Sequence, residues 1–158
     1  MSKITTCLWF DGNAEEAANF YVSLLPDSRV DKVLRSPADY PNGSAGSVLT
    51  VEFTVAGQPF IGLNGGPQNP FTDAVSFMVN CEDQREVDRL WDALTEGGSP
   101  VQCGWLKDRY GLSWQITPTA LLKMMADPDR EKAKRVMQAM MEMVKIDIAG
   151  LQKAYDGR

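Results

Sequence analysis

The chain of 158 residues contains no histidine. This absence excludes serine–histidine–aspartate and cysteine–histidine catalysis, metal triads built on imidazole, and the usual general base near neutral pH. Any chemistry must therefore come from carboxylates, cysteine, lysine, tyrosine, the backbone or a cofactor.

Cysteine is scarce, with only Cys7, Cys81 and Cys103 present. An odd number of cysteines at these spacings predicts neither a disulfide framework nor a CxxC redox or zinc motif. We therefore expect buried, reduced thiols. A nucleophilic role for Cys103, which lies beside Gly104, is the alternative, but no histidine is present to activate its thiol.

Long apolar runs and basic stretches are also missing. No run approaches the roughly 18 apolar residues of a membrane span, and Met1–Lys3 leads into a predicted strand without the apolar region of a signal peptide. The charged residues give 16 − 21 = −5, and no basic stretch carries interleaved aromatics. We predict a cytoplasmic protein with no membrane or nucleic-acid partner.

The chain does contain an internal repeat. Residues 4–25 are echoed by residues 74–95, without a gap, at an offset of 74 − 4 = 70. In each copy a cap residue lies three positions before a glutamate, the signature of a capping box. Apolar residues then follow at i, i+3, i+4 and i+7, as in an amphipathic helix. The cap pairs are Asn13 with Glu16 and Asp83 with Glu86, and the stripes are Ala17, Phe20, Tyr21 and Leu24, then Val87, Leu90, Trp91 and Leu94.

Further strands are predicted after each helix. Residues 47–55 alternate between apolar and polar, which indicates a strand with one apolar face. The whole pattern predicts two βαβββ modules, residues 1–67 and 68–118, followed by a helical tail over residues 119–158. A stripe from Met137 to Leu151 in the tail is typical of a core or a subunit contact.

The segments CLWFDGNAEEAANFY, TVEFTVAGQPFIGLNGGP, CEDQREVDRLWDAL, CGWLKDRYGLSWQITP and the tail RVMQAMMEMVKIDI are distinctive in combination. They resemble the PhnB-like family, often labelled 3-demethylubiquinone-9 3-methyltransferase, of the vicinal oxygen chelate (glyoxalase/bleomycin-resistance/extradiol dioxygenase) superfamily. The resemblance implies an α+β fold: two tandem βαβββ modules that form a curved mixed sheet around a cavity, plus C-terminal helices, commonly in a homodimer.

The resemblance also implies where a metal would lie. Enzymes of the superfamily usually hold a divalent metal on His and Glu residues at fixed strand positions. Those positions correspond here to Thr6, Gly62, Ser76 and Gln115. Because none of these residues offers an imidazole or a carboxylate, we predict that the metal site is absent.

The face opposite the apolar strand residues is expected to line the cavity. Glu52 is the one carboxylate on that face, and apolar walls would raise its pKa and suit it to general acid or base catalysis. A simple exposed or hydrogen-bonded glutamate is the alternative, and Trp105 is either a cavity wall or a core residue. The predicted ligand-binding residues are Thr6, Leu8, Glu52, Asn64, Ser76, Met78, Trp105 and Gln115.

Three functions are compatible with these residues. The first is a metal-free binding protein for a small, largely apolar molecule, with no cofactor. The second is a cofactor-free isomerase or proton-transfer enzyme that uses Glu52. The third is the methyltransferase of the family label, which would need a glycine-rich turn such as GxGxxG before a helix, and neither helix has one. The turn residues Lys107–Arg109 could recognise an anion or form a solvated charged turn.

Overall fold

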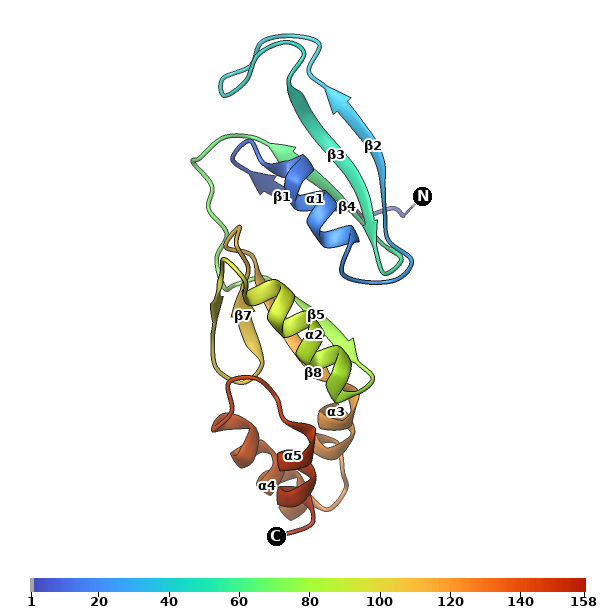
Figure 1. Ribbon diagram of the computed structural model, residues 1–158, viewed down its shortest axis with the longest axis vertical. Coiled ribbons are helices and arrows are strands. Elements are labelled where there is room, and N and C mark those ends of the chain that lie inside the picture. Colours follow the sequence, from blue (N-terminus) through green and yellow to red (C-terminus); the bar gives the residue numbers. More distant parts are fainter. Residues whose placement is uncertain (1) are drawn as a thin grey trace. The chain divides into compact units, whose positions relative to one another are not determined.

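The computed structural model describes residues 2–158. It divides into two compact units, one up to Phe71 and one from Thr72 to Arg158. Each unit contains a four-stranded mixed sheet with a helix across one face (Figure 1). The predicted α+β fold with two tandem βαβββ modules is confirmed. The division into residues 1–67, 68–118 and 119–158 stays a prediction, and the tail helices belong to the second compact unit.

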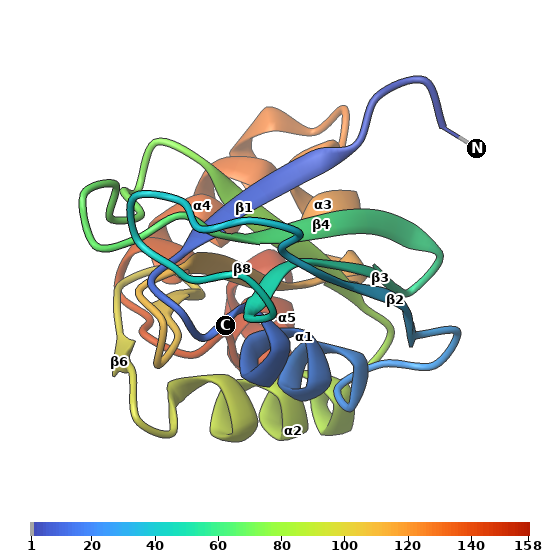
Figure 2. The ribbon, with the colours of Figure 1, turned by 90° about the horizontal axis from the view of Figure 1, so that it is seen from above.

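The first unit consists of β1 (Thr6–Phe10), α1 (Ala14–Val22), β2 (Arg29–Arg35), β3 (Val48–Val55) and β4 (Gln58–Asn64). The strand order is β1-β4-β3-β2, with β1 parallel to β4 and the other neighbours antiparallel. Figure 2 shows α1 to one side of these strands. Phe53 of β3 stacks on Tyr21 of α1 and on Phe60 of β4, so the core of this unit lies between the sheet and α1.

The second unit repeats this arrangement. It contains β5 (Ser76–Cys81), α2 (Gln84–Thr95), β6 (Ser99–Pro100), β7 (Trp105–Lys107) and β8 (Ser113–Pro118). The order is β5-β8-β7-β6, and β5 is parallel to β8. The predicted stripe of α2 is buried over its whole length. The predicted repeat therefore has the same strand order and pairing directions in both units.

The two copies differ by one residue between strand and helix. Residues 11–13 separate β1 from α1, whereas only residues 82–83 separate β5 from α2. Gly12 accommodates the longer connection in the left-handed region, at φ +82°. Because side chains alternate along a strand, a shift of one residue turns every side chain of β1 to the opposite face. Leu8 and Phe10 consequently face α1 and are buried.

The capping box predicted for the second helix is present in a slightly shifted form. The Asp83 carboxylate accepts a hydrogen bond from the Glu86 backbone N–H at 2.9 Å. The Glu86 carboxylate in turn accepts from the backbone N–H of Glu82, one residue before the cap, also at 2.9 Å. The first bond satisfies a donor of the first turn, and the second ties the residue before the cap to the helix.

The capping box predicted for the first helix is wrong. The Asn13 side chain makes no cap hydrogen bond. Instead, the Asn64 Oδ1 atom at the end of β4 accepts from the Ala14 backbone N–H at 2.9 Å. The Asn64 Nδ2 atom donates to the Val48 carbonyl at 3.0 Å. A side chain from a different element thus caps α1.

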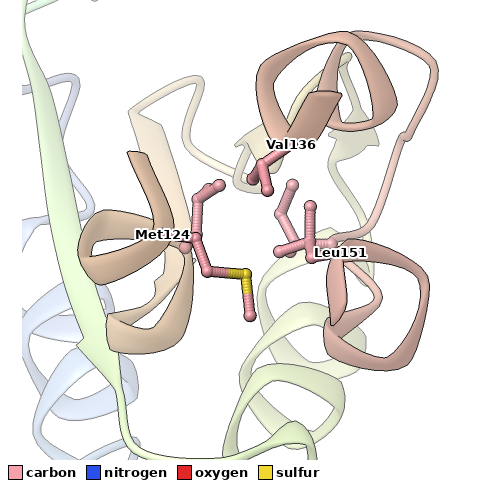
Figure 3. Close-up of a cluster of buried hydrophobic side chains, with 5 residues drawn as sticks. Met124, Val136 and Leu151 are labelled. Atoms are coloured by element: carbon pink, nitrogen blue, oxygen red, sulfur yellow. The ribbon is translucent and has the colours of Figure 1, made fainter. Parts of the chain in front are cut away.

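The tail forms α3 (Thr119–Met125), α4 (Arg130–Met141) and α5 (Ile148–Tyr155). Side chains from all three helices point toward one another in a buried cluster (Figure 3). The continuous stripe predicted from Met137 to Leu151 is wrong, because α4 ends at Met141 and residues 142–147 are not helical. Among residues 2–158, no helix is long and apolar enough to cross a membrane. The cluster comprises Leu121, Met124, Val136, Ile146 and Leu151.

Candidate functional site

Each sheet has one face that its own helix leaves uncovered, which we call the open face of that unit. On the open face of the second unit, Gln115 of β8 is paired with Met78 of β5 on one side and with Trp105 of β7 on the other. Ser76 lies two residues before Met78 and therefore shares its face. The structure places these four predicted residues together.

A polar pair lies on this open face. The Gln115 Nε2 atom donates a hydrogen bond to Ser76 Oγ at 3.0 Å. Within residues 2–158, no group donates to the Gln115 Oε1 atom, which leaves a carbonyl oxygen that can accept from a bound molecule. Met78 is 46% exposed and Trp105 is half-buried, so a thioether and an indole flank the amide.

A charged group marks one end of the same sheet. The Asp73 Oδ1 atom accepts from Ser113 Oγ at 3.1 Å and lies 3.2 Å from the Lys107 ammonium. The hydrogen bonds from Lys107 and Ser113 hold the pKa of the Asp73 carboxyl below its usual range. Lys107 is therefore engaged with a carboxylate in the structure.

The turn that follows Lys107 is held by an inward-facing carboxylate. Asp108 is only 3% exposed. Its carboxylate accepts from the backbone N–H groups of Tyr110 and Leu112 at 2.8 and 3.1 Å, and from Trp114 Nε1 at 2.9 Å. The Asp108 carboxylate therefore holds the turn from inside the fold, and the expectation of a solvated turn is wrong for this residue.

Three predicted ligand-binding residues of the first unit lie on the wrong face for that role. Thr6, Leu8 and Asn64 lie on the side of α1, and Leu8 and Asn64 are each 6% exposed. Gly62 also faces the helix, since a Cβ atom there would lie 3.2 Å from the Ala14 Cβ. For Thr6 and Leu8 of β1, the cause is the one-residue difference in the connection before α1. Their predicted orientation toward the cavity is therefore wrong.

Glu52 does lie on the open face of the first unit, as predicted. It is half-buried and paired across the sheet with Lys32 and Ile61. No hydrogen bond or ion pair joins its carboxylate to another of the described residues. The carboxylate is therefore available to a ligand or to water.

Four further residues of this open face escaped the sequence reasoning. Trp9 is half-buried, and its Nε1 atom donates to the Gly66 carbonyl at 2.9 Å. The turn sequence Asp11-Gly12 is the signal that could have revealed Cys7 and Trp9, because it lengthens the connection from β1 to α1 by one residue. These residues are Cys7, Trp9, Ile61 and Leu63.

The three cysteines are free thiols in different surroundings. Cys81 is fully buried, and burial raises the pKa of its thiol to about 12. Cys103 is half-buried, whereas Cys7 is exposed, so the expectation of uniformly buried thiols is wrong for Cys7. Desolvation still raises the pKa of the Cys7 thiol, which disfavours the reactive thiolate.

The residues present do not fit the metal of the superfamily. Thr6 and Gly62 face α1, while Ser76 and Gln115 are hydrogen-bonded to each other. In the described part of the chain, no three His, Cys, Asp or Glu side chains are grouped so that they could hold a metal ion. The neutral hydroxyl and amide that remain are weak ligands for a transition metal.

The protein also lacks the S-adenosylmethionine site that a doubly wound fold would provide. Both sheets are mixed, with a single parallel pair each. The connections from β1 to α1 and from β5 to α2 contain a single glycine in total, Gly12, instead of a glycine-rich turn.

Two shallow surface hollows, of about 520 and 430 Å³, include none of the predicted ligand-binding residues.

Comparison with known proteins gives a consistent picture. The sequence pattern of the family described as 3-demethylubiquinone-9 3-methyltransferase matches residues 2–117. The PhnB protein from Bacillus cereus has 37% sequence identity and a TM-score of 0.67, over 74% of this chain and 99% of that chain. The protein PA1353 from Pseudomonas aeruginosa has 22% identity and a TM-score of 0.62, over 75% and 98%.

A glyoxylase/bleomycin resistance protein/dioxygenase domain from Frankia sp. EAN1pec is more distant, with 14% identity and a TM-score of 0.46 over 75% and 92% of the two chains. No curated protein matches the chain significantly. The family match ends at Thr117, so the tail, which contributed to the resemblance seen in the sequence, lies outside it.

Proposed function

The chain belongs to the 3-demethylubiquinone-9 3-methyltransferase family, and from that premise we propose that it binds a small, largely apolar organic molecule without a metal ion. The proposed site is the open face of the second unit. The observation that carries the proposal is the hydrogen-bonded pair of Gln115 and Ser76, which lies between the side chains of Met78 and Trp105.

The chemistry of this face defines the class of ligand. A carbonyl oxygen that loses water without gaining a donor costs roughly 1–3 kcal/mol, so the ligand must supply a donor to Gln115 Oε1. The indole of Trp105 and the thioether of Met78 pack well on an apolar ring or chain. We therefore expect a ligand with an apolar body and one or two polar groups.

A thermal-shift screen of hydrophobic metabolites and antibiotics tests this proposal. Compounds that stabilise the protein should do so less in the variants Gln115→Ala and Trp105→Ala. Gln58→Ala, an exposed glutamine of the first unit, is the matched control and should leave every shift unchanged. If both site variants retain all shifts in full, the open face of the second unit is not the binding site.

A second candidate function rests on Glu52. Its carboxylate is half-buried on the open face of the first unit beside Ile61, with no partner among the described residues. Such a group could accept or donate a proton in a cofactor-free isomerisation. Glu52→Gln should then lower the rate of turnover of a compound found in the screen by about a hundredfold or more. Under pure binding, this variant leaves the thermal shifts unchanged.

The methyltransferase activity in the family name would require S-adenosylmethionine to bind, and we predict that it does not. S-adenosylmethionine should not stabilise the protein, because neither strand-to-helix connection offers a glycine-rich turn to its nucleoside. Stabilisation by S-adenosylmethionine at low micromolar concentration would contradict the metal-free binding proposal and favour the named activity.

We also propose a homodimer in the cytoplasm. Each four-stranded sheet ends in two edge strands, and an uncovered edge is a ready surface for association. Sedimentation equilibrium at micromolar concentrations should give twice the mass of 17.5 kDa. A mass of one chain over that whole range would remove the dimer from the proposal.

A further inference from the structure

Residues 142–147 connect α4 to α5, and we call residues 143–148, which end at the first residue of α5, the strap. The backbone N–H groups of Cys103 and Gly104 donate to the Met143 and Val144 carbonyls at 2.8 and 2.7 Å. The strap is thus hydrogen-bonded to the segment that immediately precedes β7.

The Gln84 side chain, in the first turn of α2, holds the strap at a second point. Its Nε2 atom donates to the Ile146 carbonyl at 3.0 Å, and its Oε1 atom accepts from the Ile148 backbone N–H at 2.8 Å. One amide therefore satisfies both an acceptor and a donor of the strap. An exposed ion pair at 2.8 Å between Lys145 of the strap and Asp88 of α2 joins the same two segments.

The segment before β7 has an unusual backbone. Cys103 and Gly104 both adopt left-handed conformations, with φ of 61° and 84°. A non-glycine residue such as Cys103 keeps this conformation only where its surroundings hold it. The packing is close as well, since a Cβ atom on Gly104 would lie 2.9 Å from Ile146 Cγ1 and 3.0 Å from the Ile116 carbonyl oxygen.

Trp105 follows this segment directly. The strand β7 is only three residues long, and its outer neighbour β6 has two residues. The Gly104 carbonyl accepts from the Ile116 backbone N–H at 2.8 Å. Gly104 is therefore bonded to the strap through its N–H and to β8 through its carbonyl. The Trp105 backbone is also held locally, because its N–H donates to the Gln102 carbonyl at 3.1 Å and its carbonyl accepts from the Val101 N–H at 2.8 Å.

The strap lies outside the part of the chain that the family match covers. The family match ends at residue 117, and 74% of this chain covers 99% of the Bacillus cereus PhnB protein. The strap residues that bond the segment before Trp105 therefore lie outside the family match.

We propose that the strap, held by Gln84, positions Trp105 on the open face of the second unit and thereby sets the affinity of that face for its ligand. Gln84 and Ile146 are positioning residues, which act through the backbone of residues 103–104. The ligand part of this proposal rests on the proposed function, whereas the positioning of Trp105 does not.

Fluorine NMR of protein labelled with 5-fluorotryptophan tests the positioning directly, without any ligand. The four tryptophans give four resonances, and Trp105→Phe assigns the relevant one. Gln84→Ala should shift and broaden the Trp105 resonance and leave those of Trp9 and Trp91 unchanged. Gln152→Ala removes an exposed tail glutamine that bonds Asp156 and should change none of the four.

A gentler variant decides the matter if Gln84→Ala collapses all four resonances. Ile146→Val removes only the terminal methyl group, which lies beside Gly104. A change confined to Trp105 in this variant supports the proposal. An unchanged Trp105 resonance in Ile146→Val, or in a folded Gln84→Ala, overturns it.

Calorimetric titration with 1-anilinonaphthalene-8-sulfonate tests the ligand part, because this probe has an apolar body and one anionic group. Its Kd should rise at least about threefold in Gln84→Ala, since a mobile indole must be immobilised on binding. If Gln84→Ala moves the Trp105 resonance but Trp105→Ala leaves the Kd unchanged, the proposed function fails while the positioning role stands. An unchanged Kd in Gln84→Ala, when Trp105→Ala weakens binding, overturns the ligand part.

Discussion

The Asn64 side chain joins three elements of the first unit. It caps α1 through Ala14, bonds the beginning of β3 through Val48, and belongs to the end of β4. Both ends of its amide are satisfied in a nearly dry environment, at 6% exposure. A buried group of this kind stabilises chiefly because its partners would be left unpaired without it.

Replacing Asn64 by Ala should therefore lower the free energy of unfolding by about 1–3 kcal/mol. Urea denaturation measures the loss. Asn13→Ala is the matched control, because the Asn13 side chain makes no cap bond, and it should change stability by less than about 0.5 kcal/mol. Equal losses in the two variants would show that the cap is assigned to the wrong asparagine.

Pairs of residues differ in how well the sequence reveals them. Ser76 and Gln115 were placed on one face by strand alternation alone, and the structure joins them at 3.0 Å. The partners of Asn64 lie 50 and 16 residues away in the sequence. No local pattern encodes such a contact, so a buried cap was interpreted as a ligand-binding residue.

At the scale of elements, the repeat predicted the strands and helices well but the facing of β1 poorly. An alignment at a constant offset of 70 assumes connections of equal length, and the connection before α1 is one residue longer. The helices stayed in phase, because their caps align, while β1 was turned over. The strap between α4 and α5 was also invisible, since no proline or glycine interrupts residues 137–148.

The packing of the strap on the segment before β7 predicts a large difference between two glycines. Gly104→Ala places a Cβ atom 2.9 Å from Ile146, whereas Gly111→Ala, at a similar φ of 85°, meets nothing within 4 Å. Gly111→Ala should cost roughly 1–2 kcal/mol for the left-handed conformation alone. Gly104→Ala should cost at least about 1 kcal/mol more, because its Cβ atom would also clash with Ile146. Similar losses in urea denaturation would contradict this packing.

The tail should respond to pH through Asp127 and Tyr155. The hydrogen bond from the Tyr155 hydroxyl lowers the pKa of the Asp127 carboxyl and raises the pKa of the phenol. A carboxyl whose pKa is lowered on folding contributes stability above its unfolded pKa, about 3.9, and loses it as pH falls through the folded value. The phenol contributes below about pH 10 and loses its contribution as pH rises through its raised pKa.

The stability difference between wild type and Tyr155→Phe should therefore be largest near pH 7 and shrink below about pH 4. Urea denaturation at pH 7 and pH 3 measures this change. Tyr40→Phe, in a loop of the first unit, is the control, and its difference from wild type should be independent of pH. A Tyr155→Phe difference that stays constant between pH 7 and pH 3 would show that the bond to Asp127 contributes nothing to folding.

At the scale of the whole molecule, the chain combines the fold of its family with a site that lacks imidazole and carboxylate metal ligands. Of the four predicted metal-ligand positions, Thr6 and Gly62 face α1, and Ser76 and Gln115 offer only a hydroxyl and an amide. Protein purified without a chelator should consequently carry far less than one Zn, Fe, Mn or Ni per chain by elemental analysis. About one metal per chain that is lost in Gln115→Ala would overturn this prediction.

The central claim is that a small organic molecule binds on the open face of the second unit. Chemical-shift mapping by ¹H–¹⁵N NMR, with the most stabilising compound of the screen, tests it most directly. The largest perturbations should fall on Ser76, Met78, Gln115 and the backbone and indole N–H groups of Trp105. Perturbations confined to the α2 side of the sheet or to the tail helices, with those four residues unmoved, would contradict the claim.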